Sequence, residues 1–336
     1  MEEQKPENTL ELLTIGDATM DVYLAPTESE TLCQLDHKEC LICFAYGDKI
    51  PVKNIDFSVG GNAANNAVGA KRLGVSVGLV STIGGDLTGD QITKKLEAEG
   101  VDLTYTIQQP SANTNFSTVI NYGGERTIFS YHAPRSYEFP INMPAVGWVY
   151  LTSMGEAFEP FLRHLVTWKK GKPEVKLAFN PGSRQLRAGV EALEEILKET
   201  FLIYVNRQEA EMLTSLKDTQ GKEKELLTAL CDLGPASCVI TDGGNGSFVY
   251  NGEKYLHAGV MPVDAYERTG AGDSFGSGML SALIKGKSYE EALLWGTVNA
   301  ASVIGYIGPQ HGLLKEEEMA LWLERAKSSA VEVNEL

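Results

Sequence analysis

In the segment Thr269-Gly270-Ala271-Gly272-Asp273-Ser274-Phe275-Gly276, small residues lead directly from a polar loop into an apolar helix. The first N–H groups of a helix have no partner inside it, and the helix dipole favours negative charge at that end. Small residues over 270–272 would let a phosphoryl group approach these amides. Asp273 is then a carboxylate beside an anion hole, placed to take a proton from a hydroxyl. The alternative interpretation is that Asp273 only caps its own helix.

Neither common nucleotide-binding fingerprint explains this segment. A P-loop, G-x-x-x-x-G-K-[ST], does not occur in the sequence. The glycines over 270–276 miss the G-x-G-x-x-G spacing by one residue, and they follow polar residues rather than an apolar strand. An NAD-dependent oxidoreductase is therefore disfavoured.

Three further motifs suit phosphate and sugar chemistry. Gly60-Gly61-Asn62-Ala63-Ala64-Asn65 is a second glycine pair that opens a helix and offers amides to sugar hydroxyls. Asn206-Arg207-Gln208-Glu209 and Thr241-Asp242-Gly243-Gly244-Asn245-Gly246 each follow a predicted strand, which is where open α/β sheets bind ligands. Each motif alone is typical of a turn. All four together favour phosphoryl transfer over simple helix capping.

Short apolar runs alternate with segments of helical periodicity along most of the chain. This alternation predicts a three-layer α/β/α core with a mainly parallel sheet. The expected elements include a strand over 75–83 and a helix over 90–100. No Pro- or Ser-rich linker divides the sequence, so we expect one domain over 1–336. Segments of about 20–57 and 106–137 do not fit the alternation and are expected to form a small appended sheet.

The composition excludes some classes of function. The 336 residues include 29 Lys+Arg and 45 Asp+Glu, a net charge of −16, which argues against binding a nucleic-acid backbone. The first residues lack the pattern of a signal peptide, and no apolar run approaches the length of a membrane span. Five cysteines in a chain of this size indicate reduced thiols and a cytoplasmic location.

With these motifs, the sequence resembles the ribokinase family of carbohydrate kinases, also called the phosphofructokinase-B (pfkB) family. The resemblance extends from Thr14 to about Leu314. It implies a ribokinase-like core, a β-sheet lid built from the two appended segments, and ATP-dependent phosphorylation of a hydroxyl on a small sugar. The family signatures match 60–74, Asn206 with Glu209, Thr241 with Gly243 and Gly246, and 269–275.

The resemblance also implies roles for individual residues. Asp273 would be the general base, and the amides of Gly270, Ala271 and Gly272 would stabilise charge on the transferred phosphoryl group. Glu209 would hold Mg²⁺ through water, since this ion keeps much of its water shell. The implied sugar contacts are Asp21, Gly60, Gly61, Asn62 and Asn65. The implied nucleotide contacts are Asn206, Thr241, Gly243, Gly246 and Asn299.

One departure from the family pattern concerns a monovalent-cation site. Family members often carry Asp-Thr before Thr-Gly-Ala-Gly-Asp, and that aspartate lies at the cation site; this chain has Glu267 and Arg268 there. An arginine beside the site would replace the charge of the cation. We therefore expect activity to depend little on potassium.

The acceptor itself stays open at this point. A neutral sugar such as ribose or fructose is the first expectation; a nucleoside, a 2-keto-3-deoxy sugar acid and a sugar phosphate are alternatives. Arg126, His132 and Arg135 end the expected lid hairpin and would bind a phosphate or carboxylate on the substrate, or else are solvated charges. A non-catalytic sugar- or nucleotide-binding regulator is the alternative from another class. A homodimer through the lid strands is the preferred oligomeric state.

Four residues within the first lid segment have a second interpretation. Cys33, His37, Cys40 and Cys43 lie within eleven residues, and thiolate and imidazole at such spacing can bind zinc. Alternatively, 40–44 is an apolar lid strand that uses cysteines as small hydrophobic residues. Cys40 and Cys43 would point to opposite faces of such a strand, which favours the second interpretation.

Overall fold

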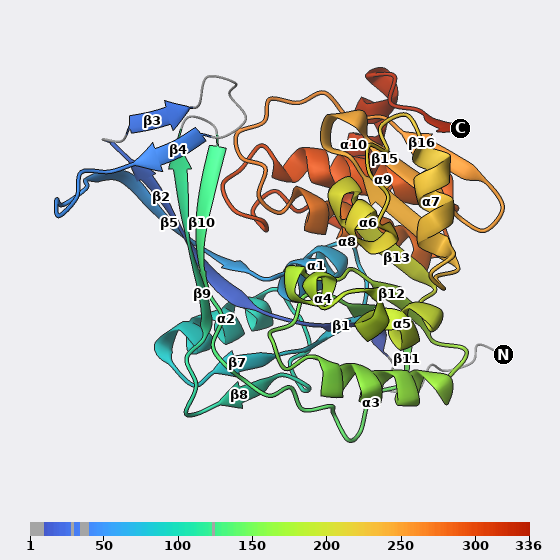
Figure 1. Cartoon of the computed structure of the whole chain (residues 1–336), viewed down its shortest axis with the longest axis horizontal. Coiled ribbons are helices and arrows are strands. Elements are labelled where there is room, and N and C mark those ends of the chain that lie inside the picture. The colour runs from blue at the N-terminus through green and yellow to red at the C-terminus, as the bar shows by residue number, and fades with distance from the viewer. Residues whose placement is uncertain (1–9, 28–29, 34–39, 123–124) are drawn as a thin grey trace.

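A computed structural model of the chain describes residues 10–27, 30–33, 40–122 and 125–336 (Figure 1). Its centre is a nine-stranded sheet with the order β17-β16-β15-β14-β13-β12-β11-β1-β6. The strands are β1 (Leu10–Ile15), β6 (Val77–Val80), β11 (Val146–Leu151), β12 (Lys176–Phe179), β13 (Leu202–Asn206), β14 (Ser237–Thr241), β15 (Ser247–Tyr250), β16 (Tyr255–Ala258) and β17 (Val333–Glu335).

The strands from β6 to β14 are parallel to one another, whereas β15, β16 and β17 join in antiparallel fashion. Successive residues of a strand face opposite sides. Leu12 therefore packs into one hydrophobic cluster and Leu13 into another, on the other face of the sheet. The mainly parallel sheet expected from the sequence is confirmed, and the carboxyl ends of its parallel strands share one edge.

Helices cover both faces of this sheet, which confirms the three-layer core. One hydrophobic cluster draws on α1, α2, α8, α9 and α10, and the other on α3 to α7. The helices are α1 (Asn62–Arg72), α2 (Leu87–Ala98), α3 (Glu159–Lys170), α4 (Ser183–Ala188), α5 (Val190–Lys198), α6 (Arg207–Thr214), α7 (Glu223–Cys231), α8 (Ala271–Ile284), α9 (Tyr289–Val303) and α10 (Glu316–Ser328), with a 3₁₀ turn, η1, at Gly243–Asn245.

A second, four-stranded sheet stands beside the core, on the left in Figure 1, and is called the lid below. Its order is β10-β9-β2-β5, with β2 parallel to β9 and antiparallel to β5. The strands are β2 (Thr19–Pro26), β5 (Val52–Gly60), β9 (Asn115–Tyr122) and β10 (Glu125–Tyr131). Two small sheets pair β3 (Glu30–Cys33) with β4 (Cys40–Cys43) and β7 (Thr82–Gly84) with β8 (Ile107–Gln109).

Some element boundaries differ from those expected. The strand expected over 75–83 is two strands, β6 and β7, which belong to different sheets. The helix expected over 90–100 begins at Leu87 because Asp86 caps it, accepting a hydrogen bond from the amide of Gly89 at 2.8 Å. The short helix α4 and the last two strands at one end of the sheet, β16 and β17, were not expected from the sequence.

The expectation of unpaired cysteines is wrong for Cys231 and Cys238, which form a disulfide between α7 and β14. In the β3–β4 hairpin, Cys33 lies opposite Cys40, whereas Cys43, a free thiol, lies at the other end. His37 is outside the described residues. Within the ranges that the structure describes, no group of three or more His, Cys, Asp or Glu residues could hold a metal ion. In the same ranges, no helix has the length and hydrophobicity to span a membrane.

An ion pair fixes the C-terminal ends of α1 and α2 against each other. Arg72 donates hydrogen bonds to both carboxylate oxygens of Glu99, at 2.7 and 2.9 Å. A further nitrogen of the same guanidinium donates to the carbonyls of Gln310 and Leu313. These bonds, with a smaller contribution from Lys95, hold the pKa of Glu99 down at about 2.

We expect Glu99→Gln to lower the free energy of unfolding at pH 7 by about 1–2 kcal/mol, because one partner of a partly exposed pair is lost. The lowered pKa means that this stabilisation is present above the ordinary glutamate pKa and is lost as the pH falls toward 2. Urea unfolding from pH 7 to pH 3.5 should therefore show the difference from wild type shrinking. Glu194→Gln, at an exposed pair with Lys198, is the control and should change little. A pH-independent difference would contradict the prediction.

Candidate active site

The start of α8 is an uncapped helix terminus. Gly270 adopts a left-handed conformation with φ 82°, and no side chain caps the helix. A Cβ atom at Gly270 would also collide with Pro309. This position therefore requires glycine both for its left-handed backbone and for lack of space. The small residues expected to form an anion hole therefore bring bare backbone to the beginning of a 14-residue helix.

Asp273 does not cap its own helix. Its carboxylate accepts a hydrogen bond at 2.8 Å from the side-chain amide of Asn65 on α1. Burial raises the pKa of Asp273 to about 6; the bond from Asn65 opposes this shift, and the negative charges of Asp21 and Glu209 add to it. A carboxyl group with such a pKa is ionised at neutral pH and able to take up a proton. This geometry favours the base interpretation over the capping interpretation.

Asn65 is itself held in place. It is buried, and its side-chain oxygen accepts a hydrogen bond at 3.0 Å from the side chain of Gln310. Because both ends of the Asn65 amide have protein partners, its contact with Asp273 is preformed. Asn65 thus orients the Asp273 carboxylate; the sugar contact that the resemblance implied for Asn65 stays a prediction.

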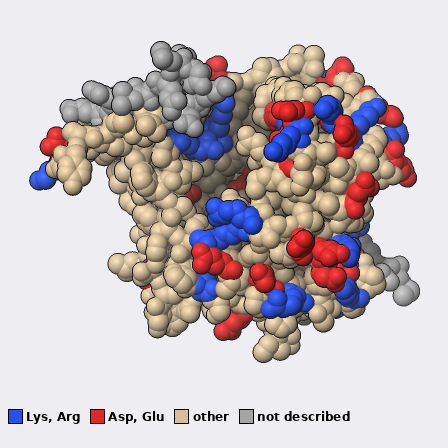
Figure 2. Space-filling view, in the orientation of Figure 1, with Lys and Arg blue, Asp and Glu red and all other residues tan. Residues whose placement is uncertain are grey.

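The glycine pair before α1 allows the lid to approach the core. A Cβ at Gly60 would overlap the carboxylate of Asp21, and a Cβ at Gly61, where φ is 88°, would collide with the backbone of Asp17. Asp21 is buried on β2, where it accepts a hydrogen bond from Thr19 at 3.1 Å, and burial raises its pKa. Asn62, the first residue of α1, follows directly. The structure thus brings Asp21 and the two glycines together, close enough to Asp273 for the charge of Asp21 to affect its pKa. The hollow between the lid and the core is called the cleft below (Figure 2).

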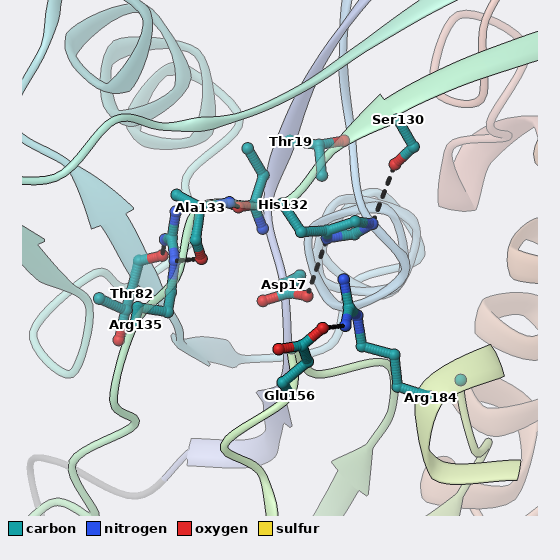
Figure 3. A network of polar contacts seen from close by, with 12 residues as sticks. Asp17, Thr19, Thr82, Ser130, His132, Ala133, Arg135, Glu156 and Arg184 are labelled. Atoms are coloured by element: carbon teal, nitrogen blue, oxygen red, sulfur yellow. Dashed lines mark hydrogen bonds and ion pairs between the residues drawn. The ribbon is translucent and has the colours of Figure 1, made fainter. Parts of the chain in front are cut away.

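A polar network is built around Asp17 (Figure 3). Asp17 follows β1 and accepts a hydrogen bond at 2.8 Å from the hydroxyl of Tyr137. The other oxygen of Asp17 has no hydrogen bond and lies 3.9 Å from Nδ1 of His132, whose Nε2 contacts Ser130 at 2.9 Å. Burial raises the pKa of Asp17 and lowers the pKa of His132. Arg184, on α4, stands nearby in an ion pair with Glu156.

Asp17, Tyr137 and Arg184 were not singled out from the sequence as site residues. The only local signal was the position of Asp17, directly after a buried strand, where α/β proteins bind ligands. Tyr137 and Arg184 come from a loop and a short helix whose placement depends on tertiary packing.

Arg135 does not reach the cleft, which corrects the expectation that it binds substrate. Its guanidinium is buried and donates to the carbonyls of Thr82 and Asn113 and to the side chain of Asn115 (Figure 3). These bonds tie β7 to the loop before β9, so Arg135 has a structural role. Arg126, by contrast, lies on β10 and lines the cleft.

Asn206 and Glu209 form a reciprocal cap at the start of α6. The side chain of Asn206 accepts from the amide of Glu209, and the carboxylate of Glu209 accepts from the amide of Asn206, both at 2.9 Å. Burial raises the pKa of Glu209. The second carboxylate oxygen stays available for a water of a magnesium ion, an arrangement that needs no cluster of acidic ligands. The residues present therefore fit the expected ion.

The glycine-rich turn after β14 lies beside this cap. Thr241 pairs with Asn206 in the register of β13 and β14, so the two motifs meet at one edge of the sheet. Gly243 and Gly246 have positive φ values of 49° and 86°. A Cβ at Gly246 would strike the carbonyl of Ala258. The turn therefore exposes backbone toward the sheet edge, as expected for phosphate contacts.

Asn299 is placed differently from its expected nucleotide contact. It is fully buried on α9 and donates to the carbonyl of Ser274 at 2.7 Å. Its oxygen accepts from the amide of Leu314 at 2.9 Å. Because this amide group is used within the protein, Asn299 joins α9 to α8, and the expectation of a nucleotide contact is replaced by a structural role.

Glu267 and Arg268 also differ from the expected arrangement. The buried carboxylate of Glu267 accepts hydrogen bonds from the amides of Thr269, at 2.8 Å, and Gly308, at 3.3 Å. Arg268 is exposed and lines the cleft from the segment that leads to Gly270, opposite the lid. The arginine therefore does not pair with Glu267, and replacement of a cation charge by Arg268 has no support from the geometry.

A raised-pKa carboxylate beside an open helix start can activate a hydroxyl next to a terminal phosphate. These features define the class of a phosphotransferase with an alcohol acceptor. A family model described as pfkB family carbohydrate kinase matches residues 10–316. The chain belongs to this family.

Individual relatives agree with this assignment. Ribokinase of Haemophilus influenzae is 29% identical over 292 residues, covering 83% of this chain and 92% of that protein. ATP-dependent 6-phosphofructokinase of Thermoanaerobacterium thermosaccharolyticum is 26% identical over 280 residues, covering 80% and 85%. The structure of Arabidopsis thaliana ribokinase complexed with ribose and ATP matches with a TM-score of 0.76 at 21% identity, covering 94% of this chain and 99% of that chain. This last likeness supports the ribokinase-like fold with its lid.

We expect Asn65→Ala to raise the kinetic pKa of the basic group above about 6, because the bond from Asn65 lowers the pKa of Asp273. Activity should then fall several-fold more at pH 6 than at pH 8. The pH profile of kcat/KM measures this shift. Gln310→Leu removes the anchor of Asn65 without touching Asp273 and should shift the profile less. An unchanged profile in Asn65→Ala would show that the hydrogen bond does not tune the base.

Proposed function

We propose that this protein transfers the terminal phosphoryl group of ATP to a hydroxyl of a small sugar-like acceptor, with Asp273 as the general base. The main support is the Asp273 carboxylate, which Asn65 holds beside the uncapped start of α8. Burial raises the pKa of this carboxylate to about 6. A protein that only bound sugar or nucleotide would have no need of this combination.

In the proposed reaction, Asp273 takes the proton of the acceptor hydroxyl as its oxygen attacks the terminal phosphorus. A bond forms between this oxygen and phosphorus, the bond from phosphorus to the bridging oxygen breaks, and ADP leaves. Amides of Gly270, Ala271 and Gly272 stabilise charge on the transferred group, which is the main task of protein in phosphoryl transfer. Mg²⁺, held near Glu209 when bound, would neutralise phosphate charge.

Other residues orient the two substrates. Asp21 on β2 accepts hydrogen bonds from acceptor hydroxyls, with Gly60, Gly61 and Asn62 beside it. Asn206, Thr241, Gly243 and Gly246 line the edge of the sheet that receives the phosphates of ATP. The lid excludes water, so that the phosphoryl group passes to the acceptor rather than to solvent.

The relatives support an acceptor of sugar type. The names ribokinase and 6-phosphofructokinase point to a neutral sugar and to a sugar phosphate, respectively. Neutral sugars, sugar phosphates, nucleosides and sugar acids all fit the proposed mechanism, because Asp273 would contact only the hydroxyl that reacts.

Replacing Asp273 with Asn should lower kcat by about 10²- to 10⁴-fold, because the proton acceptor is lost. ATP binding should persist, and wild-type activity should decline below about pH 6 as Asp273 becomes protonated. The measurement is ADP release with Mg²⁺ and a panel of sugars, sugar phosphates, sugar acids and nucleosides. Asp48→Asn, in an exposed loop, is the matched control. Full activity of Asp273→Asn, or no acceptor in the panel, would contradict the proposed function.

The outer face of the lid supports a homodimer, which we propose as the assembly. Ile55 and Phe57 on β5 and Phe129 and Tyr131 on β10 are 47–60% exposed, on the two edge strands of the sheet. Exposed apolar residues at sheet edges commonly mark interaction surfaces. A second copy of this chain, carrying the same face, would cover them.

Phe57→Asp combined with Phe129→Asp should convert the dimer to a monomer, since a charge would be buried in the interface. Light scattering coupled to size-exclusion chromatography measures the mass of wild type and variant. Ile141→Asp is the control, because Ile141 is 98% exposed and lies outside the lid strands. A monomeric wild type at micromolar concentration would refute this assembly.

A further inference from the structure

The inner face of the lid is organised in rows across its strands. Asp21 lies in register with Ser58 on β5 and Ser117 on β9, and Ser117 with Ser130 on β10. This first row faces the catalytic base, as the effect of Asp21 on the pKa of Asp273 shows. Residues two positions apart on a strand face the same side of the sheet. The residues two and four positions beyond this row therefore also face inward.

The next two rows carry different side chains. Tyr23 lies in register with Asp56 and Val119, and Arg126 with Asn121. Two strand residues span about 7 Å, so Tyr23 is about that distance beyond Asp21 along β2. These second and third rows of the inner face therefore lie roughly one monosaccharide length from the residues expected to hold the acceptor hydroxyls.

A cavity of about 340 Å³ opens between the second and third rows of the inner lid face and the core. Tyr23, Asn121 and Arg126 line it from the lid; Tyr266, Glu267 and Arg268 line it from the segment that leads to Gly270. Figure 2 shows the hollow between the lid, on the left, and the core, with basic side chains on its lid wall. The cavity therefore lies beside the site built around Asp273, since Tyr23 follows Asp21 on β2 and Arg268 precedes Gly270 by two residues.

Two arginines meet at this cavity from opposite walls. Among the described residues, the side chains of Arg126 and Arg268 form no hydrogen bond or ion pair, whereas those of Arg72, Arg135 and Arg207 are each bonded to several groups. Each free guanidinium offers paired N–H donors that match the oxygens of a phosphate or carboxylate.

Tyr23 adds a donor between them. It is only 2% exposed, and its hydroxyl has no hydrogen-bond partner among the described residues. Burial raises the pKa of Tyr23, as do the charges of Asp21 and Glu267, so the hydroxyl keeps its proton; the charge of Arg126 acts in the opposite direction. A buried hydroxyl without a partner is costly, and a ligand oxygen would satisfy it.

The acidic residues at the cavity do not cancel this positive charge. The carboxylate of Glu267 is engaged by the amides of Thr269 and Gly308. Asp56, across from Tyr23 on β5, is the other carboxylate of the lining. The two amide dipoles offset the negative charge of Glu267. The two positive charges of Arg126 and Arg268 therefore exceed the single negative charge of Asp56.

We propose that this cavity binds an anionic substituent of the acceptor, at the end remote from the hydroxyl that reacts with ATP. Arg126 and Arg268 hold the anion from the two walls, and Tyr23 donates a hydrogen bond to it. The acceptor is accordingly an acidic sugar derivative, either a sugar phosphate or a sugar acid. This inference rests on the proposed function and replaces the neutral sugar expected first from the sequence.

The test compares acceptors that differ in the charged group. Fructose 6-phosphate is paired with fructose, and 2-keto-3-deoxygluconate with 3-deoxyfructose, so that phosphate and carboxylate are examined separately. ADP release gives kcat and KM for wild type, Arg126→Gln, Arg268→Gln and Tyr23→Phe. Arg163→Gln is the matched control, because Arg163 is an exposed arginine on α3, outside the cleft.

We expect the anionic member of one pair to have the higher kcat/KM in wild type. Arg126→Gln and Arg268→Gln should each lower that value by roughly 10- to 100-fold, mainly through KM, because a charge-assisted hydrogen bond is lost. Tyr23→Phe should lower it less, and Arg163→Gln should not change it. The KM for ATP should be unaffected. A preference for both neutral sugars, or equal losses for anionic and neutral acceptors, would overturn the inference.

A binding measurement separates failure of this inference from failure of the proposed function. Calorimetry of fructose 6-phosphate and 2-keto-3-deoxygluconate, without ATP, reports on the cavity alone. Binding that Arg126→Gln weakens at least tenfold would support the cavity even if no acceptor is phosphorylated. Absence of binding by both anions would overturn the inference, whereas turnover of a neutral sugar that depends on Asp273 would leave the proposed function standing.

Discussion

The hydrogen bond from Asn65 to Asp273 joins two helices whose first residues are more than 200 positions apart in the chain. Its 2.8 Å length depends on close packing of α1 against α8. A Cβ atom at Gly69 would overlap Ser277, so the two helices approach as closely as only glycine permits. Gln310 then fixes Asn65 from the other side. The position of Asp273, the proposed base, follows from this contact.

The electrostatics of the site explain how an acidic protein can handle phosphates. The net charge of −16 is spread over the chain, whereas the proposed phosphate contacts are backbone amides at the start of α8 and in the turn after β14. Fixed amide dipoles attract an anion without any lysine or arginine. Besides burial, the charges of Asp21 and Glu209 raise the pKa of Asp273, the proposed base. In the proposed mechanism, these acidic residues therefore serve proton transfer while the backbone serves the phosphates.

The sequence revealed the parts of this site that are written in local patterns. The starts of α8 and α1 each depend on residues within a single turn, and each was predicted at the right place. The segment from Asn206 to Glu209 was correctly placed after a strand, but its reciprocal cap was not predicted. Arg135 and Asn299 were misjudged because their partners lie on elements distant in sequence. Arg268 was expected beside a cation site because it follows Glu267 in the sequence. The two side chains point in different directions, that of Glu267 into the protein and that of Arg268 into the cleft. The Cys231–Cys238 disulfide had no compositional signal in a chain with so few cysteines.

In the proposed function, residues of the lid select the acceptor and residues of the core carry out the transfer. On β2 and β5 the two-residue period of a strand places Asp21, Tyr23 and Asp56 on the cleft side and Ile55 and Phe57 on the other. The base and the amides at α8 belong to the core, where close helix packing leaves little freedom to change. The inner lid face is a row of side chains on a sheet, and an exchange there alters the cavity without moving Asp273. Acceptor specificity can therefore change through residues such as Arg126, while the transfer step keeps the same geometry.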